Sequence, residues 1–141
     1  IQAAILLEKL TIFKSELLKR EEIAKQYIER FVTLKTSIQL PKILENINSS
    51  WAQFTIKLPP YCNREKFQSL MRKKNIPTAI YYPIPIHCQS PYKNFPLSPD
   101  DLNNTMKLSN SVISLPMHPY LSQENVDYIS NTVDEIIRNL I

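Results

Sequence analysis

Residues 78–89 read Thr-Ala-Ile-Tyr-Tyr-Pro-Ile-Pro-Ile-His-Cys-Gln, and the rest of the chain is interpreted outward from this stretch. Its opening, Thr78–Ile80, is a short apolar run typical of a buried strand. Pro83 and Pro85 then fix φ and remove two backbone donors, so regular structure must stop there. The sequence therefore predicts a strand that ends in a stiff, extended segment carrying two phenols, an imidazole and an amide.

This segment has two interpretations. A rigid polar loop at a strand end is a common way for α/β proteins to present side chains to a ligand. The alternative is a proline-rich surface connection whose tyrosines pack on the core. His87 and His118 are each conceivable as a general base, but a lone His beside prolines is more often packed or in contact with a ligand. The residues alone indicate a ligand-contacting accessory domain and nothing more specific.

Upstream, the pattern predicts a strand, a helix and then the strand of residues 78–80. Ser50–Leu58 is rich in aromatic and β-branched residues, as strands are. Asn63 is a good N-cap for the helix that follows. Asn75 is expected to take the left-handed position that usually requires glycine, and Pro77 prevents the helix from resuming.

Downstream, two more helices and one strand are expected. Ser98-Pro99-Asp100-Asp101 combines a cap, a proline and first-turn acids, which predicts a helix that runs to about Ser109. Val112–Leu115 is a short strand. Ser122 caps the last helix, which has an apolar face. That face consists of Val126, Ile129, Val133, Ile136 or Ile137, and Leu140.

The first third of the chain is predicted to be mostly helical. Ile1–Phe13 is apolar on nearly every side, so we expect another domain or subunit to cover it. Lys14–Leu34 is a second helix or a continuation, with an apolar stripe at helical spacing. The charges of Lys19–Glu22 lie largely off that stripe and are expected to be solvated. Thr36–Ser50 lacks periodicity and is predicted to be irregular.

Composition indicates a globular chain of one domain. It has 141 residues, 43% of them hydrophobic, and a net charge of +4 spread along the sequence. Nucleic-acid binding is not expected, because it needs clustered cations with aromatic platforms. No apolar run is long enough to cross a bilayer, and no signal peptide is visible. The chain opens on Ile1 rather than Met, so we expect part of a longer protein.

The chemistry of a self-sufficient catalyst is missing. Cys62 and Cys88 have no metal or disulfide spacing, which predicts reduced thiols and a cytoplasmic setting. A metal site at His87, Cys88 and His118 is conceivable, but adjacent His and Cys make poor geometry, and we predict no metal. The chain has no glycine, which excludes glycine-rich phosphate loops and a nucleophile elbow. No carboxylate pair stands out.

Four ordered blocks carry a resemblance to a known family. They are Ile-Gln-Ala-Ala-Ile-Leu at 1–6, Ser-Trp-Ala-Gln-Phe-Thr-Ile at 50–56, Ile-Pro-Thr-Ala-Ile-Tyr-Tyr-Pro-Ile-Pro-Ile-His at 76–87, and Ser-Leu-Pro-Met-His-Pro-Tyr-Leu at 114–121. The chain resembles the C-terminal part of the DegT/StrS family of sugar aminotransferases. These are pyridoxal-phosphate enzymes of the type I aminotransferase fold that aminate nucleotide-linked keto-sugars.

The patterns described above predict one or two leading helices and then about three strands backed by three helices, and the resemblance implies that they form the α/β small domain of the type I aminotransferase fold. Residues 1–13 would be the end of the large domain or a bridge from it, and 14–141 the small domain. The catalytic lysine and the cofactor contacts would lie in the large domain, which is absent here. We therefore nominate no catalytic and no cofactor-binding residue in this chain.

The resemblance also implies contacts with a nucleotide-sugar in a homodimer whose active sites lie at the subunit interface, with an amino acid as donor. It nominates Tyr82 and His87 as substrate contacts, and Tyr81 and Gln89 after them. The chain alone is expected to be inactive. The alternative is a non-catalytic binding module that self-associates through its apolar N-terminal helix.

Overall fold

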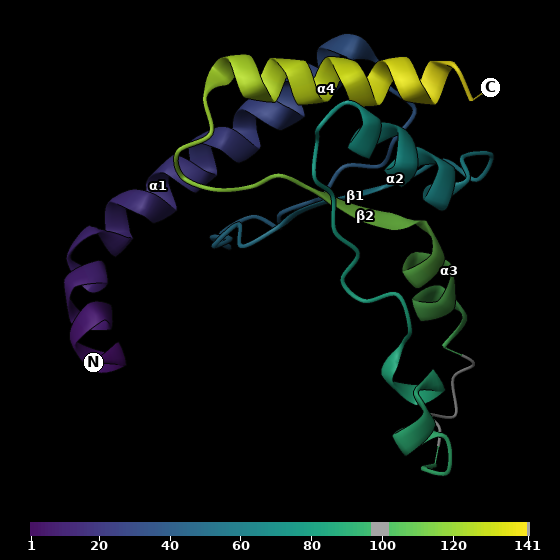
Figure 1. Ribbon diagram of the computed structural model, residues 1–141, viewed down its shortest axis with the longest axis horizontal. Helices are drawn as coiled ribbons and strands as arrows, with labels where there is room; N and C mark the ends of the chain where they lie inside the picture. The colour runs from purple at the N-terminus through teal and green to yellow at the C-terminus, as the bar shows by residue number, and fades with distance from the viewer. Residues whose placement is uncertain (97–101, 141) are drawn as a thin grey trace.

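The computed structural model describes residues 1–96 and 102–140. A body forms from the second half of α1, helices α2 and α4, and a small sheet, while the first half of α1 and the region of η1, η2 and α3 project from it (Figure 1). The elements in chain order are α1 (Gln2–Leu34), β1 (Phe54–Lys57), α2 (Arg64–Lys73), the 3₁₀ helices η1 (Ile86–Cys88) and η2 (Ser90–Tyr92), α3 (Asn103–Ser111), β2 (Val112–Leu115) and α4 (Gln123–Arg138).

The sheet is antiparallel, with β1 paired to β2 so that Phe54 faces Leu115 and Ile56 faces Ile113. These four side chains share one face of the sheet and are buried. Two single bridges widen the layer, Gln39 to Lys57 on the β1 side and Ala79 to Ser114 on the β2 side. The expected strand at Thr78–Ile80 is thus reduced to one bridged residue.

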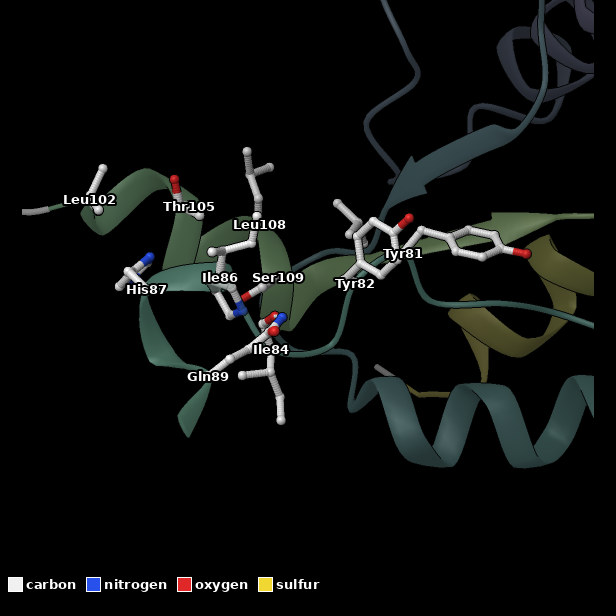
Figure 2. A pocket seen from close by; sticks show the side chains of 12 residues that line it. Tyr81, Tyr82, Ile84, Ile86, His87, Gln89, Leu102, Thr105, Leu108 and Ser109 are labelled. Carbon is white, nitrogen blue, oxygen red and sulfur yellow. Dashed lines mark hydrogen bonds between the residues drawn. The ribbon is translucent and has the colours of Figure 1, made fainter. Parts of the chain in front are cut away.

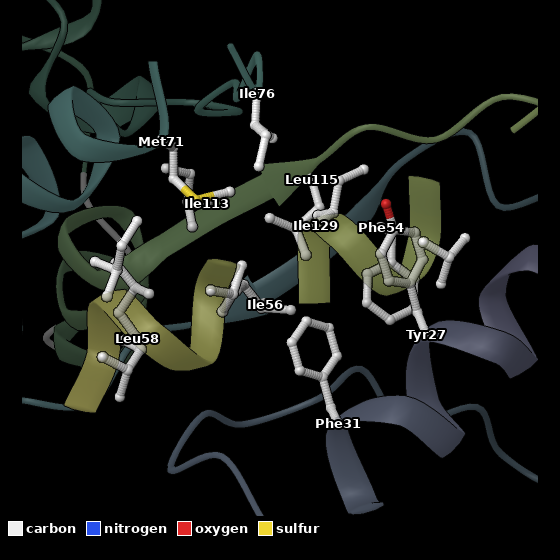
Figure 3. Packing of buried hydrophobic residues seen from close by; sticks show 14 of the residues in the cluster. Tyr27, Phe31, Phe54, Ile56, Leu58, Met71, Ile76, Ile113, Leu115 and Ile129 are labelled. Atoms are coloured by element: carbon white, nitrogen blue, oxygen red, sulfur yellow. The ribbon is translucent and has the colours of Figure 1, made fainter. Parts of the chain in front are cut away.

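The core lies between this sheet face and the helices (Figure 3). Tyr27 and Phe31 of α1 stack with each other and Tyr27 stacks on Phe54, with ring centroids 6.1 Å and 4.7 Å apart. The Tyr27 hydroxyl donates to the Pro116 carbonyl at 3.0 Å, and burial raises the pKa of this phenol. The predicted apolar face of α4 is confirmed, since Val126, Ile129, Val133, Ile136 and Ile137 are all buried in this core.

Helix α1 is one continuous helix of 33 residues, so Lys14–Leu34 is a continuation of the first segment. Residues 2–15 of this helix are all exposed, including the apolar Leu6, Leu10 and Phe13. Only the second half packs against α4 and the sheet. Among the described helices, none combines the length and the apolar character that crossing a membrane requires.

The sequence predicted that the charge run Lys19–Glu22 is solvated, and this prediction is wrong for two of its residues. Arg20 donates to the Trp51 carbonyl at 3.1 Å, and Glu21 accepts the Trp51 indole N–H at 2.6 Å. Trp51 has a φ of 46° and a buried ring. This left-handed residue turns the chain, so β1 begins at Phe54 rather than at Ser50.

The helix ends follow the predicted local chemistry. The Asn63 side chain accepts from the Lys66 N–H at 2.8 Å, and Ser122 accepts from the Asn125 N–H at 3.2 Å. Asn75 has a φ of 59° and ends α2 as expected. The predicted helix start Ser98–Asp101 lies outside the described residues. Helix α3 ends at Ser111, close to the predicted end at about Ser109.

Candidate functional site

An open groove of about 640 Å³ lies between the proline-rich segment and α3 (Figure 2). One wall comes from the segment that follows Ala79, and the other comes from α3 and the start of β2. The first wall is lined by Tyr81, Tyr82, Ile84, Pro85, Ile86, His87 and Gln89, and the second by Leu102, Thr105, Leu108, Ser109 and Val112. The groove is therefore built almost entirely outside the main core.

The structure brings all four nominated residues, Tyr81, Tyr82, His87 and Gln89, to this groove. In Figure 2 the two tyrosines lie at one end and His87 at the other, beyond Ile86. The tyrosine rings pack edge to face at 6.0 Å, and Tyr82 is 74% exposed. Their positions are compatible with contacts to a ligand along the groove, and their role in binding stays a prediction.

The sequence predicted an extended proline-rich segment, but this wall of the groove is partly folded. The Cys88 N–H donates to the Pro85 carbonyl at 2.9 Å, and the Gln89 N–H donates to the Ile86 carbonyl at 3.0 Å, which folds residues 86–88 into a 3₁₀ turn. The Gln89 side-chain amide then donates to the Ile84 carbonyl at 3.0 Å. Gln89 thus braces the wall through its side-chain N–H group.

The α3 wall adds two hydroxyls that sequence reasoning missed, those of Thr105 and Ser109. Ser109 is buried, and its hydroxyl donates to the Met106 carbonyl at 2.9 Å. The sequence carried no signal for them, because the approach of α3 to residues 81–89 is a tertiary contact between segments that share no pattern. Across the two walls, the Cys88 Sγ lies 3.6 Å from the Met106 Sδ.

Among residues 1–96 and 102–140, those that line the groove include no lysine, arginine, aspartate or glutamate. Phenol, imidazole, amide and hydroxyl groups stand beside apolar side chains such as Ile84, Ile86 and Leu108. Sites of this make-up orient a hydroxylated ligand by hydrogen bonds while its less polar faces rest on the apolar surface. The described part of the lining thus offers no amine nucleophile and no carboxylate base.

His118 is not part of this groove. It lines a separate hollow of about 450 Å³ beside Lys74 and Tyr128, and its Nδ1 accepts from the Tyr120 N–H at 3.3 Å. Across residues 1–96 and 102–140, the structure gathers no set of three or more His, Cys, Asp or Glu side chains suited to a metal ion. Cys62 and Cys88 are both free thiols, and burial raises the pKa of Cys62.

Comparison with known proteins identifies relatives across nearly the whole chain. The chain is 38% identical over 133 residues to UDP-2-acetamido-2-deoxy-3-oxo-D-glucuronate aminotransferase of Pseudomonas aeruginosa, covering 92% of this chain and 34% of that protein. It is 32% identical over 139 residues to dTDP-3-amino-3,6-dideoxy-alpha-D-galactopyranose transaminase of Aneurinibacillus thermoaerophilus, covering 95% and 35%. The chain thus spans about a third of the length of these relatives.

A solved structure shows the same fold. The DegT DnrJ EryC1 StrS aminotransferase from Brucella abortus superposes with a TM-score of 0.85 at 36% identity, covering 94% of this chain and 34% of that one. This likeness confirms the α/β fold class of the type I aminotransferases. The model of the DegT/DnrJ/EryC1/StrS aminotransferase family matches residues 1–134. The chain therefore belongs to the DegT/DnrJ/EryC1/StrS aminotransferase family.

Proposed function

We propose that this chain is the small domain of a pyridoxal-phosphate-dependent aminotransferase that acts on a nucleotide-linked keto-sugar, with glutamate or a similar amino acid as donor. The observation that carries the proposal is the family match over residues 1–134. Two relatives named for UDP- and dTDP-linked sugars support the substrate class. Because the chain spans about a third of such relatives, the activity is assigned to a longer protein and not to residues 1–141 alone.

The reactive end of the cofactor does not fit the groove of this chain. Pyridoxal phosphate requires a lysine amine for its aldehyde and an acid for its ring nitrogen, and the groove-lining residues that the structure describes supply neither. We therefore place the cofactor in polypeptide outside this chain. In this scheme residues 1–13 are the end of the larger domain or the bridge from it, and residues 14–141 are the small domain.

The groove is assigned to the sugar-nucleotide. The Tyr81 and Tyr82 hydroxyls and the His87 imidazole would hydrogen-bond sugar hydroxyls or phosphate oxygens, and Gln89 would hold the wall on which they stand. Ile84 and Ile86 would contact the less polar faces of the ligand. The proline-rich wall is already folded by its own hydrogen bonds. Ligand binding there would therefore cost little further conformational entropy of the chain.

The direct test uses the whole protein that contains this chain. Purified protein is expected to show the near-visible absorbance of bound pyridoxal phosphate, and that absorbance should change when glutamate is added. Amino transfer should follow with a UDP- or dTDP-linked keto-sugar, and should be much slower with the same keto-sugar lacking its nucleotide. A whole protein that binds no pyridoxal phosphate would refute the assignment.

The exposed apolar half of α1 favours a second possibility, a binding module without chemistry that self-associates through this helix. The two proposals differ in what the whole protein does. Under the second, self-association is retained while cofactor absorbance and amino transfer are both absent. Under the first, cofactor absorbance and amino transfer are both present, and α1 contributes surface to the larger domain or to a homodimer.

A further inference from the structure

Helix α3 is joined to the body at its C-terminal end. The carbonyls of the last turn of a helix have no partners within it. In α3, two of them are met by other elements: the Leu58 N–H donates to the Ser111 carbonyl at 2.9 Å, and the Arg64 guanidinium donates to the Ser109 carbonyl. The chain then continues directly into β2 at Val112. These contacts set where the α3 wall of the groove stands.

Arg64 occupies an unusual place for a cation. It is the first residue of α2, where the positive end of the helix dipole disfavours positive charge. Its half-buried side chain instead reaches the C-terminal end of α3, where the same principle favours a cation. The N-terminus of α2 is already capped by Asn63, so Arg64 is not needed for that purpose. The positive charge of Arg64 is therefore explained by its contact with the C-terminal end of α3 and not by its position on α2.

Ser109, the residue held by Arg64, belongs to the groove itself. It is buried and lines the groove between Thr105 and Val112. Leu108, the residue before it, lines the same wall and lies opposite the segment that carries His87 (Figure 2). Movement of the last turn of α3 would therefore change the width of the groove without touching any of the four nominated residues.

We propose that Arg64 is a positioning residue, which caps α3 and so fixes the spacing of the groove walls for the nucleotide-linked keto-sugar. It does this from outside the groove and without contact with the ligand. The inference rests on the proposed function of the groove. It adds a residue, Arg64 on α2, that the residues lining the groove do not include.

The kinetic test compares Arg64→Ala, Arg64→Lys and Arg72→Ala in the whole enzyme. Arg64→Ala is expected to raise KM for the keto-sugar nucleotide about tenfold and to leave KM for the amino donor and the cofactor absorbance unchanged. Arg64→Lys keeps the charge and should recover most of the affinity. Arg72 is exposed on the same helix, so Arg72→Ala is the matched control and should behave as wild type. Equal losses for both substrates, together with lost cofactor, would indicate general destabilisation and overturn the inference.

Hydrogen exchange tests the structural step independently of turnover. In Arg64→Ala, amides of residues 103–111 should exchange about tenfold faster, while those of α4 remain as in wild type. Unchanged exchange in α3 would overturn the inference. A failure of the proposed function would be seen differently, as a wild-type enzyme that does not turn over any keto-sugar nucleotide.

Discussion

The phenol groups of Tyr81 and Tyr82 lie at one end of the groove. Within residues 1–96 and 102–140, neither hydroxyl makes a hydrogen bond. Tyr82 is the more exposed of the two, at 74% against 48%. A tyrosine that packs for its ring alone would bury more of it. The exposure therefore favours the interpretation that a ligand, rather than the core of this chain, is the partner of Tyr82.

Replacing Tyr82 with Phe is expected to raise KM for the keto-sugar nucleotide by about twofold to tenfold in the whole enzyme, because one neutral hydrogen bond contributes about 0.5–1.5 kcal/mol. KM for the amino donor should not change. The matched control is Tyr92→Phe, since Tyr92 is also exposed but does not line the groove. Steady-state kinetics with each substrate varied in turn measures both constants. If the two variants gave the same values, Tyr82 would not be a substrate contact.

The family resemblance led to the nominated residues, and the local chemistry of the proline-rich stretch pointed to the same segment, but neither indicated the residues of the opposite wall. The proline-rich stretch is recognisable in the sequence by its two prolines and its polar side chains. In the structure, Tyr81, Tyr82, His87 and Gln89 all line one groove. The roles of Arg20 and Glu21 were misjudged, because a charge run has the same pattern whether it is solvated or bonded. Only the fold brings Glu21 within 2.6 Å of the Trp51 indole nitrogen, thirty positions further along the chain.

The C-terminus of α2 shows how a chain without glycine ends a helix. The Asn75 N–H donates to the Arg72 carbonyl at 3.0 Å, and the Ile76 N–H donates to the Met71 carbonyl at 3.0 Å. This is the Schellman arrangement, with Asn75 in the left-handed conformation. Ile76 is buried, so the motif also anchors the chain that leads to the groove.

Asn75→Ala is expected to destabilise the whole protein by about 1 kcal/mol, because a Cβ without a compensating side-chain amide is disfavoured at positive φ. Asn75→Gly should be neutral or slightly stabilising, since glycine adopts this conformation without a steric cost. Chemical denaturation of the three proteins, fitted with a common slope, gives the differences. A loss as large in the glycine variant as in the alanine variant would contradict this account.

Secondary structure was predictable where a segment's own residues determine it and less so where pairing decides. Helices α2 and α4 have the expected caps, and β2 has the expected bounds. Residues 78–80 look like a strand by composition, but Ala79 makes only a single bridge to Ser114. Pro77 before it and the prolines after Tyr82 limit how far that pairing can extend.

At the scale of the molecule, the dominant feature is the separation between a packed body and two projecting parts (Figure 1). A helix of 33 residues is roughly 50 Å long, and its exposed first half is well beyond the reach of the sheet. Large apolar side chains exposed in this way normally mark a surface that another polypeptide covers. The sequence predicted that another domain or subunit covers residues 1–13, and in the structure the body of this chain leaves their apolar side chains exposed.

Residues 1–141 produced alone are therefore expected to self-associate. Leu6→Glu combined with Leu10→Glu should shift the chain toward monomer, because both changes place charge on the apolar face of α1. Sedimentation velocity at several concentrations measures the shift. Gln2→Glu combined with Thr11→Glu adds the same charge at exposed polar positions of the same half-helix and serves as control. A monomeric unsubstituted chain would contradict the expectation.

The order of pairing in the sheet has a consequence for how the polypeptide is made. Strand β2 lies between β1 and Ala79, yet it follows both in the sequence. During synthesis the two flanking segments leave the ribosome first and wait without their shared partner until Val112–Leu115 emerges. Chaperones that bind nascent apolar segments would meet Phe54 and Ile56 without their β2 partners, Leu115 and Ile113, throughout that interval.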